Sequence, residues 1–101
     1  METVACESLE EVRTHIDRID HDMVALIAER GGFVKQAARF KKTSDDVKAP
    51  QRVEEVLLKV RALANELGAD ASVVEHVWRA MIAGFVEAEL VEHGALGDKS
   101  K

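Results

Sequence analysis

The sequence predicts an all-α fold in which one long helix and two shorter ones form a single domain. Apolar residues recur at steps of three and four along most of the chain, which is typical of amphipathic helices. Hydrophobic residues make up 47% of the 101 residues and charged residues 33%, a balance that favours a globular domain over a disordered chain. Aromatics at 4% and a single proline leave little material for a β-sandwich.

The first predicted helix runs from Ser8 to about Lys42, which corresponds to roughly 50 Å of helix. Gly31 and Gly32 lie in its interior, where each costs about 1 kcal/mol relative to alanine. We expect the helix to continue through this pair, because the apolar residues after it keep the phase of those before it. The stripe consists of Leu9, Val12, Ile16, Ile19, Met23, Leu26, Ile27, Val34 and Ala37.

A loop is predicted over residues 43–49, where Thr, Ser and two Asp compete for backbone hydrogen bonds. Pro50 disfavours helix at Ala49 and suits the first turn of a second helix. Gly68 supplies the stop of that helix. Its apolar stripe consists of Val53, Val56, Leu57, Val60, Leu63 and Leu67.

The third predicted helix opens near "DASVVE", with Asp70 or Ser72 as N-cap and Glu75 placed to form a capping box with Ser72. It continues through an apolar stripe to about His93. We therefore expect one domain over residues 8–93, a flexible N-terminus over residues 1–7 and a disordered tail over residues 94–101.

Composition and charge exclude several classes of function. The lone Cys6 can form neither an internal disulfide nor a multi-cysteine zinc site, and the acidic N-terminal segment does not resemble a signal peptide, so we expect a reducing cytoplasmic setting. No run approaches the roughly 18 apolar residues that span a bilayer, which predicts no membrane partner. A net charge of −5 disfavours nucleic acid as a partner.

Three ionisable residues fall on faces that the helices should bury. Arg30 and Lys41 lie within about 40° of Val12 and Met23 on a helical wheel, in the middle of the apolar stripe. Glu89 falls on the apolar face of the third helix. One interpretation is that the residues near helix ends reach water and that Arg30 pairs with a carboxylate. The other is a cationic pocket for a small anion, since arginine matches a carboxylate with two parallel hydrogen bonds.

Arg13 lies at the edge of the same stripe, about 25 Å of helix from Arg30, which is too far for both side chains to bind one small ligand within one chain. If Arg13 joins the pocket, it must come from a second subunit. Two shorter helices also cannot cover the long helix fully. Both observations predict a homodimer with intertwined long helices.

Four stretches together carry a family resemblance: "VRTHIDRIDHDMVALIAER", "VKQAARFK", "APQRV" and "FVEAEL". With these, the chain resembles the AroQ class of chorismate mutases from about Leu9 to Leu90. In length and in the spacing from Lys41 to Arg52 it is particularly similar to the isochorismate-pyruvate lyases of salicylate biosynthesis, which share that fold. The resemblance implies an intertwined all-α dimer with two active sites, each taking one arginine from the partner chain.

By position, the resemblance implies that Arg13 is the partner's arginine and that Arg30 binds the other substrate carboxylate. Lys41 looks like the lysine that contacts the ether oxygen. Gln51 falls where the mutases often have a glutamate that binds the ring hydroxyl, and Glu89 where many bacterial members have glutamine. We expect Lys41 and Glu89 to be catalytic, and the pocket wall to include Val34, Ile82 and Phe85.

The implied reaction is the pericyclic rearrangement of chorismate to prephenate, in the context of aromatic amino acid biosynthesis. It needs no metal, nucleophile or redox cofactor, because the protein selects the reactive conformer and stabilises charge that develops on the ether oxygen. Glu89 could donate a hydrogen bond to that oxygen only when protonated. Isochorismate, which would give salicylate and pyruvate, or the 4-amino analogue of chorismate are alternative substrates. A non-catalytic regulatory dimer or a helical interaction module is the alternative outside enzymology.

No metal site is expected. The four histidines do not share a helix face with a cysteine or carboxylate set at zinc-site spacing, so the sequence favours surface positions for them. Cys6 falls in the predicted flexible N-terminus and has no evident role. The histidines are His15, His21, His76 and His93.

Overall fold

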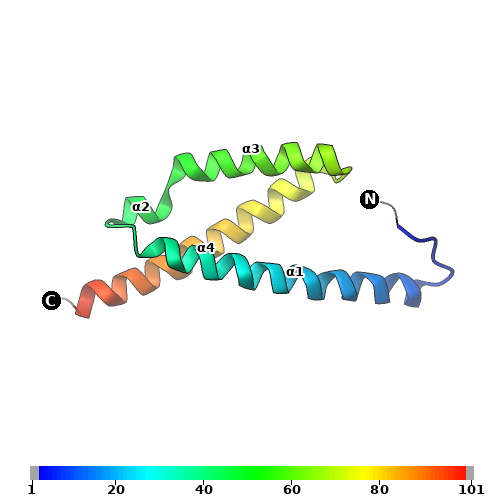
Figure 1. Cartoon of the computed structure of the whole chain (residues 1–101), viewed down its shortest axis with the longest axis horizontal. Helices are drawn as coiled ribbons and strands as arrows, with labels where there is room; N and C mark the ends of the chain where they lie inside the picture. Colours follow the sequence, from blue (N-terminus) through cyan, green and yellow to red (C-terminus); the bar gives the residue numbers. More distant parts are fainter. Residues whose placement is uncertain (1–2, 100–101) are drawn as a thin grey trace.

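Helices account for all the regular secondary structure in the part of the chain that the structure describes. This computed structural model describes residues 3–99, with side chains as far as residue 92. The helices are α1 (Leu9–Ala38), α2 (Ser44–Lys48), α3 (Pro50–Leu67) and α4 (Ala71–Lys99). Figure 1 shows α3 and α4 joined in a hairpin, with α4 crossing α1 near the C-terminal end of α1. The predicted all-α class is therefore confirmed, with three long helices and one short one.

Helix α1 begins as the sequence predicts and ends earlier than expected. The Ser8 hydroxyl caps it by accepting a hydrogen bond from the Glu11 amide at 3.1 Å. The helix continues unbroken through Gly31 and Gly32, which confirms the predicted continuity. It ends at Ala38 and not near Lys42, because the next amides bond three residues back and tighten the last turn. The periodicity of the apolar residues does not indicate that α1 ends at Ala38.

The loop predicted over residues 43–49 is wrong for most of its length, since Ser44–Lys48 forms the short helix α2. The polar residues that suggested a loop instead build a capping box. The Thr43 hydroxyl accepts from the Asp46 amide at 3.1 Å, and the Asp46 carboxylate accepts from the amides of Lys42 and Thr43. These bonds from Lys42 and then Thr43 lower the pKa of Asp46 below its ordinary value. Val47, which is 2% exposed, anchors α2.

Helix α3 has the predicted boundaries. Pro50 occupies its first turn, and Gly68 ends it with a φ of 78° that favours glycine. Ala49 joins α2 to α3 in the left-handed region, with a φ of 37°. The apolar face of α3 packs on α4 and supplies most of the small core, through Leu57, Val60 and Ala64.

Helix α4 is capped by Asp70, whose carboxylate accepts from the amides of Ser72 and Val73. The predicted capping box between Ser72 and Glu75 is wrong. Glu75 instead joins α3 to α4, because it accepts from Arg61 at 2.6 Å and from Arg79 at 2.8 Å.

The end of α4 also differs from expectation. The helix runs to Lys99 and does not end near His93, because no proline interrupts it and each added residue gains a backbone hydrogen bond. Residues 94–99 of the predicted tail are thus helical, and residues 100–101 lie outside the described part.

The single chain is too extended for a compact monomer. Its radius of gyration is 17.4 Å, whereas a compact domain of this length has about 13 Å. It exposes 8226 Å², whereas a folded monomer of 11.1 kDa exposes about 5,700 Å². Much of the difference lies on α1, where no side chain is buried. Ile16, Ile19 and Met23 are 49%, 45% and 44% exposed, so its apolar stripe is uncovered.

Within the described residues, none of the helices combines the length and the apolar character required to cross a bilayer.

Candidate active site

A pocket of about 390 Å³ lies where the C-terminal part of α1, α2, the start of α3 and the second half of α4 converge. This volume is in the range of small-molecule sites, roughly 300–1,000 Å³. Apolar side chains from three helices form most of its wall, among them Val34, Val53, Val56, Ile82, Phe85 and Val86. The pocket therefore offers a largely apolar environment in which any charged group interacts strongly.

An ion pair between Lys41 and Glu89 stands inside this pocket. Glu89 is only 7% exposed, and the Lys41 side chain is 23% exposed. The ammonium of Lys41 donates to both carboxylate oxygens, at 3.2 Å to Oε1 and 3.1 Å to Oε2. A lysine ammonium has three N–H donors, so one remains for a ligand. Glu89 thus fixes the position of Lys41 and leaves it able to bind.

Arg30 reaches the pocket from α1 and lies over an aromatic ring of α4. Its guanidinium carbon is 5.7 Å from the centroid of Phe85, a cation–π contact worth about 0.5–2 kcal/mol. The Cε1 and Cζ atoms of the same ring are close to Gly31, where an added Cβ would lie 3.0 Å and 3.2 Å from them. Glycine at this position allows the ring to approach α1, and the ring in turn holds the arginine at the pocket wall.

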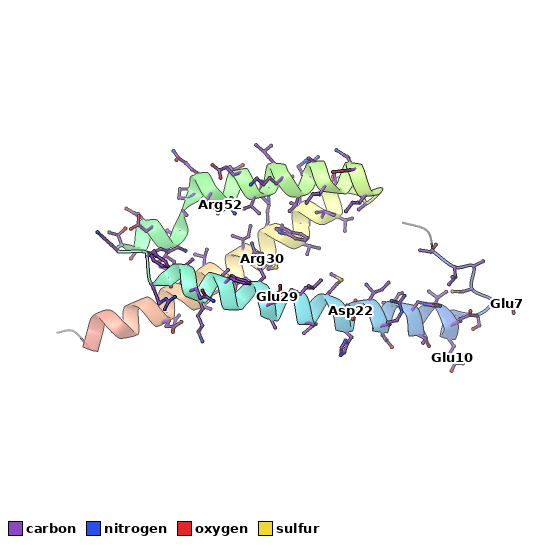
Figure 2. All side chains as sticks on the ribbon, in the orientation of Figure 1. Glu7, Glu10, Asp22, Glu29, Arg30 and Arg52 are labelled. Carbon is purple, nitrogen blue, oxygen red and sulfur yellow. The ribbon has the colours of Figure 1, made fainter. Side chains whose placement is uncertain are left out.

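Two further cations border the pocket. Lys48 comes from the end of α2 and Arg52 from the first turn of α3. Arg52 also makes an exposed ion pair with Glu55, with 3.4 Å between nitrogen and oxygen. Figure 2 labels Arg30 on α1 and Arg52 on α3, and both residues line the pocket. The lining residues therefore carry four positive charges against the one negative charge of Glu89, although the chain is acidic overall.

This arrangement suits a small anion with more than one negative group. Cations in an apolar cleft focus the field and attract an anionic ligand over short distances. The lining residues contain a single carboxylate and no histidine or cysteine, which is a poor donor set for a metal ion.

Comparison with known proteins identifies the family. A family model described as chorismate mutase type II matches residues 12–90. The chain belongs to the type II chorismate mutase family. It is 35% identical over 85 residues to the isochorismate pyruvate lyase of Pseudomonas aeruginosa, a match that covers 84% of each chain. It is also 30% identical over 77 residues to the chorismate mutase of Methanocaldococcus jannaschii, which covers 75% of this chain and 78% of that relative.

Within this family fold, the pocket brings together six of the residues singled out from the sequence. They lie on three different parts of the chain: Arg30 and Val34 on α1, Lys41 just after it, and Ile82, Phe85 and Glu89 on α4. Lys41 is not on the long helix, as the wheel assumed, but it enters the pocket through the turn that follows α1.

Gln51 is not among the residues that line this pocket. It lines a neighbouring hollow with Asp45, Asp46 and Glu55, and that hollow shares Ala49 and Arg52 with the pocket. The first turn of α3 therefore places Arg52, and not Gln51, on the pocket wall. The expected contact of Gln51 with a ring hydroxyl stays a prediction.

Arg13 also lies away from the pocket, near the other end of α1. This placement agrees with the distance argument that one chain cannot bring Arg13 and Arg30 to one ligand.

The sequence reasoning did not assign Lys48 and Arg52 to the site. Arg52 is one helical turn before Val56, which belongs to the predicted apolar stripe of the second helix. Its place on that face is a sequence signal that points to the pocket. The position of Lys48 at the pocket is set by helix α2, and the sequence predicted a loop there.

Proposed function

We propose that the protein is a chorismate mutase, which converts chorismate to prephenate in a cytoplasmic homodimer. The observation that carries this proposal is the Lys41–Glu89 pair, held with Arg30 in an apolar cationic pocket. Chorismate has two carboxylates and an enolpyruvyl ether. In the reaction the ether C–O bond breaks, and a C–C bond forms between the enolpyruvyl methylene and the ring. The step is intramolecular, so it needs binding geometry and charge stabilisation and no nucleophile.

In the proposed mechanism, the arginines hold the substrate and Lys41 acts on the bond that breaks. Arg30 binds one carboxylate, and Arg13 of the partner chain binds the other. The free N–H of Lys41 donates to the ether oxygen, where negative charge develops in the transition state. Arg52 and Lys48 add positive charge at the pocket edge, which favours entry of a dianion.

Glu89 has two proposed roles, which depend on its proton. As a carboxylate it holds Lys41 through both oxygens. As a carboxylic acid it donates a second hydrogen bond to the ether oxygen, in addition to the one from Lys41. The second form stabilises the transition state more, because two donors then reach the ether oxygen.

The dimer is supported by the uncovered stripe of α1. The excess of exposed area over a compact monomer is about 2,500 Å², which is enough for the larger, obligate class of subunit interface. A second copy with its α1 alongside the first would cover this stripe and could bring its Arg13 to the open pocket.

The second candidate is an isochorismate pyruvate lyase, which the 35% identical relative favours. Isochorismate is also a dicarboxylate with an enolpyruvyl ether. Its ether C–O bond breaks while a ring hydrogen moves to the enolpyruvyl methylene, giving salicylate and pyruvate. In this reaction Arg30 and the partner's Arg13 would again bind the carboxylates, and Lys41 would again donate to the ether oxygen.

A product assay distinguishes these proposals. The purified protein is incubated with chorismate and, separately, with isochorismate, and prephenate, salicylate and pyruvate are quantified. Prephenate formed with the higher kcat/KM supports the mutase. A higher kcat/KM for salicylate and pyruvate would replace the mutase with the lyase. No turnover of either substrate, together with no binding of a bicyclic transition-state analogue, would favour a non-catalytic dimer.

A further inference from the structure

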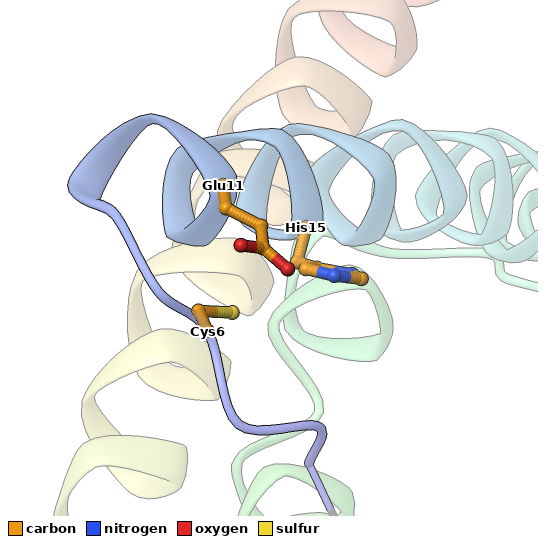
Figure 3. A group of neighbouring side chains, drawn as sticks. All are labelled: Cys6, Glu11 and His15. Atoms are coloured by element: carbon orange, nitrogen blue, oxygen red, sulfur yellow. The ribbon is translucent and has the colours of Figure 1, made fainter.

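A second cluster of reactive side chains lies far from the pocket, at the start of α1. Cys6 belongs to the segment before the helix, whereas Glu11 and His15 are one helical turn apart on α1. The segment folds back on the helix, so that the thiol of Cys6 lies beside both side chains (Figure 3). One ligand atom from each residue, the sulfur, a carboxylate oxygen and a ring nitrogen, lies within 4.8 Å of the other two.

Local hydrogen bonds hold this fold-back in place. The amide of Glu7 donates to Oε2 of Glu11 at 3.1 Å, which leaves the other carboxylate oxygen available. The amide of Glu11 donates to the Ser8 hydroxyl at 3.1 Å, so the backbone of Glu11 is fixed by the helix cap. Second-shell hydrogen bonds of this kind orient a carboxylate toward a metal ion in known sites.

The three side chains form a donor set that suits a borderline-soft dication. Thiolate, imidazole and carboxylate are the ligands of Zn²⁺, at about 2.0–2.3 Å from the metal. Ligand atoms at those distances lie about 3.2–3.8 Å apart in a tetrahedral site. Small rotamer changes of Cys6, Glu11 and His15 would bring their ligand atoms from within 4.8 Å of one another to that range. Glu7 and Glu10 lie close by in the sequence and add negative charge, which lowers the cost of placing a dication there.

We infer that Cys6, Glu11 and His15 form a binding site for Zn²⁺ or a similar late first-row dication, with its fourth position open to water. The bound ion links the N-terminal segment to the first two turns of α1 and reduces the freedom of that segment. Arg13 stands on the same turns, between Glu11 and His15 in the sequence. The inference does not depend on the proposed function, because its test measures metal binding and not turnover.

The expected absence of a metal site stays untested, but the structure places a thiol and a carboxylate beside His15, which the histidine spacing did not indicate. Glu11 and His15 have the four-residue spacing that puts two ligands on one helix face. The sequence contained that signal, but the third ligand depends on the backward path of residues 3–7, which no periodic pattern indicates.

The test uses the full chain with Zn²⁺ and with Co²⁺ as a spectroscopic probe. Zn²⁺ affinity is measured by competition with a chromophoric chelator under reducing conditions. Co²⁺ is titrated while thiolate-to-cobalt charge transfer in the near ultraviolet and the visible d–d bands are recorded. The variants are Cys6→Ser, Glu11→Gln and His15→Asn. His21→Asn serves as the control, because His21 is an exposed histidine on the same helix, beside Asp22.

We expect the wild type to bind one Zn²⁺ per chain and to give the charge-transfer band with Co²⁺. Each ligand variant should weaken Zn²⁺ binding by more than about tenfold, and Cys6→Ser should remove the charge-transfer band. His21→Asn should bind as the wild type does. Circular dichroism shows whether each variant stays helical. Equal affinity in the wild type and the three ligand variants, or a charge-transfer band that survives Cys6→Ser, would overturn the inference.

Discussion

Replacing Gly31 by alanine tests how closely Phe85 packs against α1. A glycine-to-alanine change inside a helix gains about 1 kcal/mol from backbone entropy. At Gly31 the new Cβ would lie 3.0 Å from Cε1 and 3.2 Å from Cζ of Phe85, so the ring must move by a few tenths of an ångström. Overpacking of this kind costs about 1–3 kcal/mol. We therefore expect the free energy of unfolding of Gly31→Ala to be lower than that of the wild type by about 0–2 kcal/mol.

Gly32 is a matched control in the same turn. In the described part of the chain, no heavy atom outside its own helix lies within 4 Å of the Cβ that alanine would add. Gly32→Ala should therefore be stabilised by about 1 kcal/mol, and the two variants should differ by about 1–3 kcal/mol. Urea unfolding followed by circular dichroism measures both values. The protein concentration is held constant, because the proposed dimerisation would add to apparent stability.

The same displacement should reach the pocket. Phe85 supports Arg30, so a shifted ring should move the guanidinium and raise KM for the substrate in Gly31→Ala and not in Gly32→Ala. A double-mutant cycle with Phe85→Leu should recover the stability of Gly31→Ala, because the smaller side chain removes the close contact. The reasoning is refuted if Gly31→Ala is as stable as Gly32→Ala and binds substrate equally well.

Three further predictions concern ionic groups. Lys41→Ala should lower kcat by about two to three orders of magnitude, because the proposed donor to the ether oxygen is lost. The helical content and the proposed dimer should be retained. Near-normal turnover in steady-state assays would remove Lys41 from the mechanism. Glu89→Gln should raise kcat at pH 7, because the glutamine amide can donate to the ether oxygen whereas a carboxylate cannot. A kcat no higher than that of the wild type would contradict the proposed donor role of this position. Arg79 and then Arg61 lower the pKa of Glu75 below its ordinary value of 4.5 by hydrogen bonding. A depressed carboxyl pKa contributes stability above the unfolded value and loses it as the pH falls through the folded value. Glu75→Gln should therefore lower Tm at pH 7, and the gap from the wild type should narrow below about pH 4.5; a constant gap across that range would show that charge does not cause it.

Local signals in the sequence were sufficient to predict most of the helices. The stripe of α1, the start of α3 at Pro50 and its end at Gly68 follow from periodicity and backbone preference. Arg30 and Glu89 stood out because they break an apolar face, and a charge on a buried face must be paired or used. The structure brings both to one pocket, together with Lys41.

Features that depend on tertiary contacts were not predictable in the same way. The end of α1 at Ala38 has no glycine or proline to mark it. The polar residues of segment 43–48 fit either a loop or a capped turn, and burial of Val47 helps decide for the helix α2. Whether Gln51 or Arg52 reaches the pocket wall depends on the orientation of the first turn of α3, because neighbouring residues on a helix point about 100° apart.

The claim at the centre of this account is that each site takes Arg30 from one chain and Arg13 from the other. Arg13→Ala and Arg30→Ala are purified separately, and each variant is expected to be nearly inactive. They are then unfolded, mixed in equal amounts and refolded, and turnover of chorismate and isochorismate is measured.

A mixed dimer has one site with both arginines intact and one site that lacks both. Random reassociation puts half the chains into mixed dimers, so about one quarter of the wild-type activity should return. If both arginines act within one chain, every site in the mixture lacks one of them. Activity that stays at the level of the separate variants, after a wild-type sample has refolded to full activity in the same procedure, would contradict the shared site.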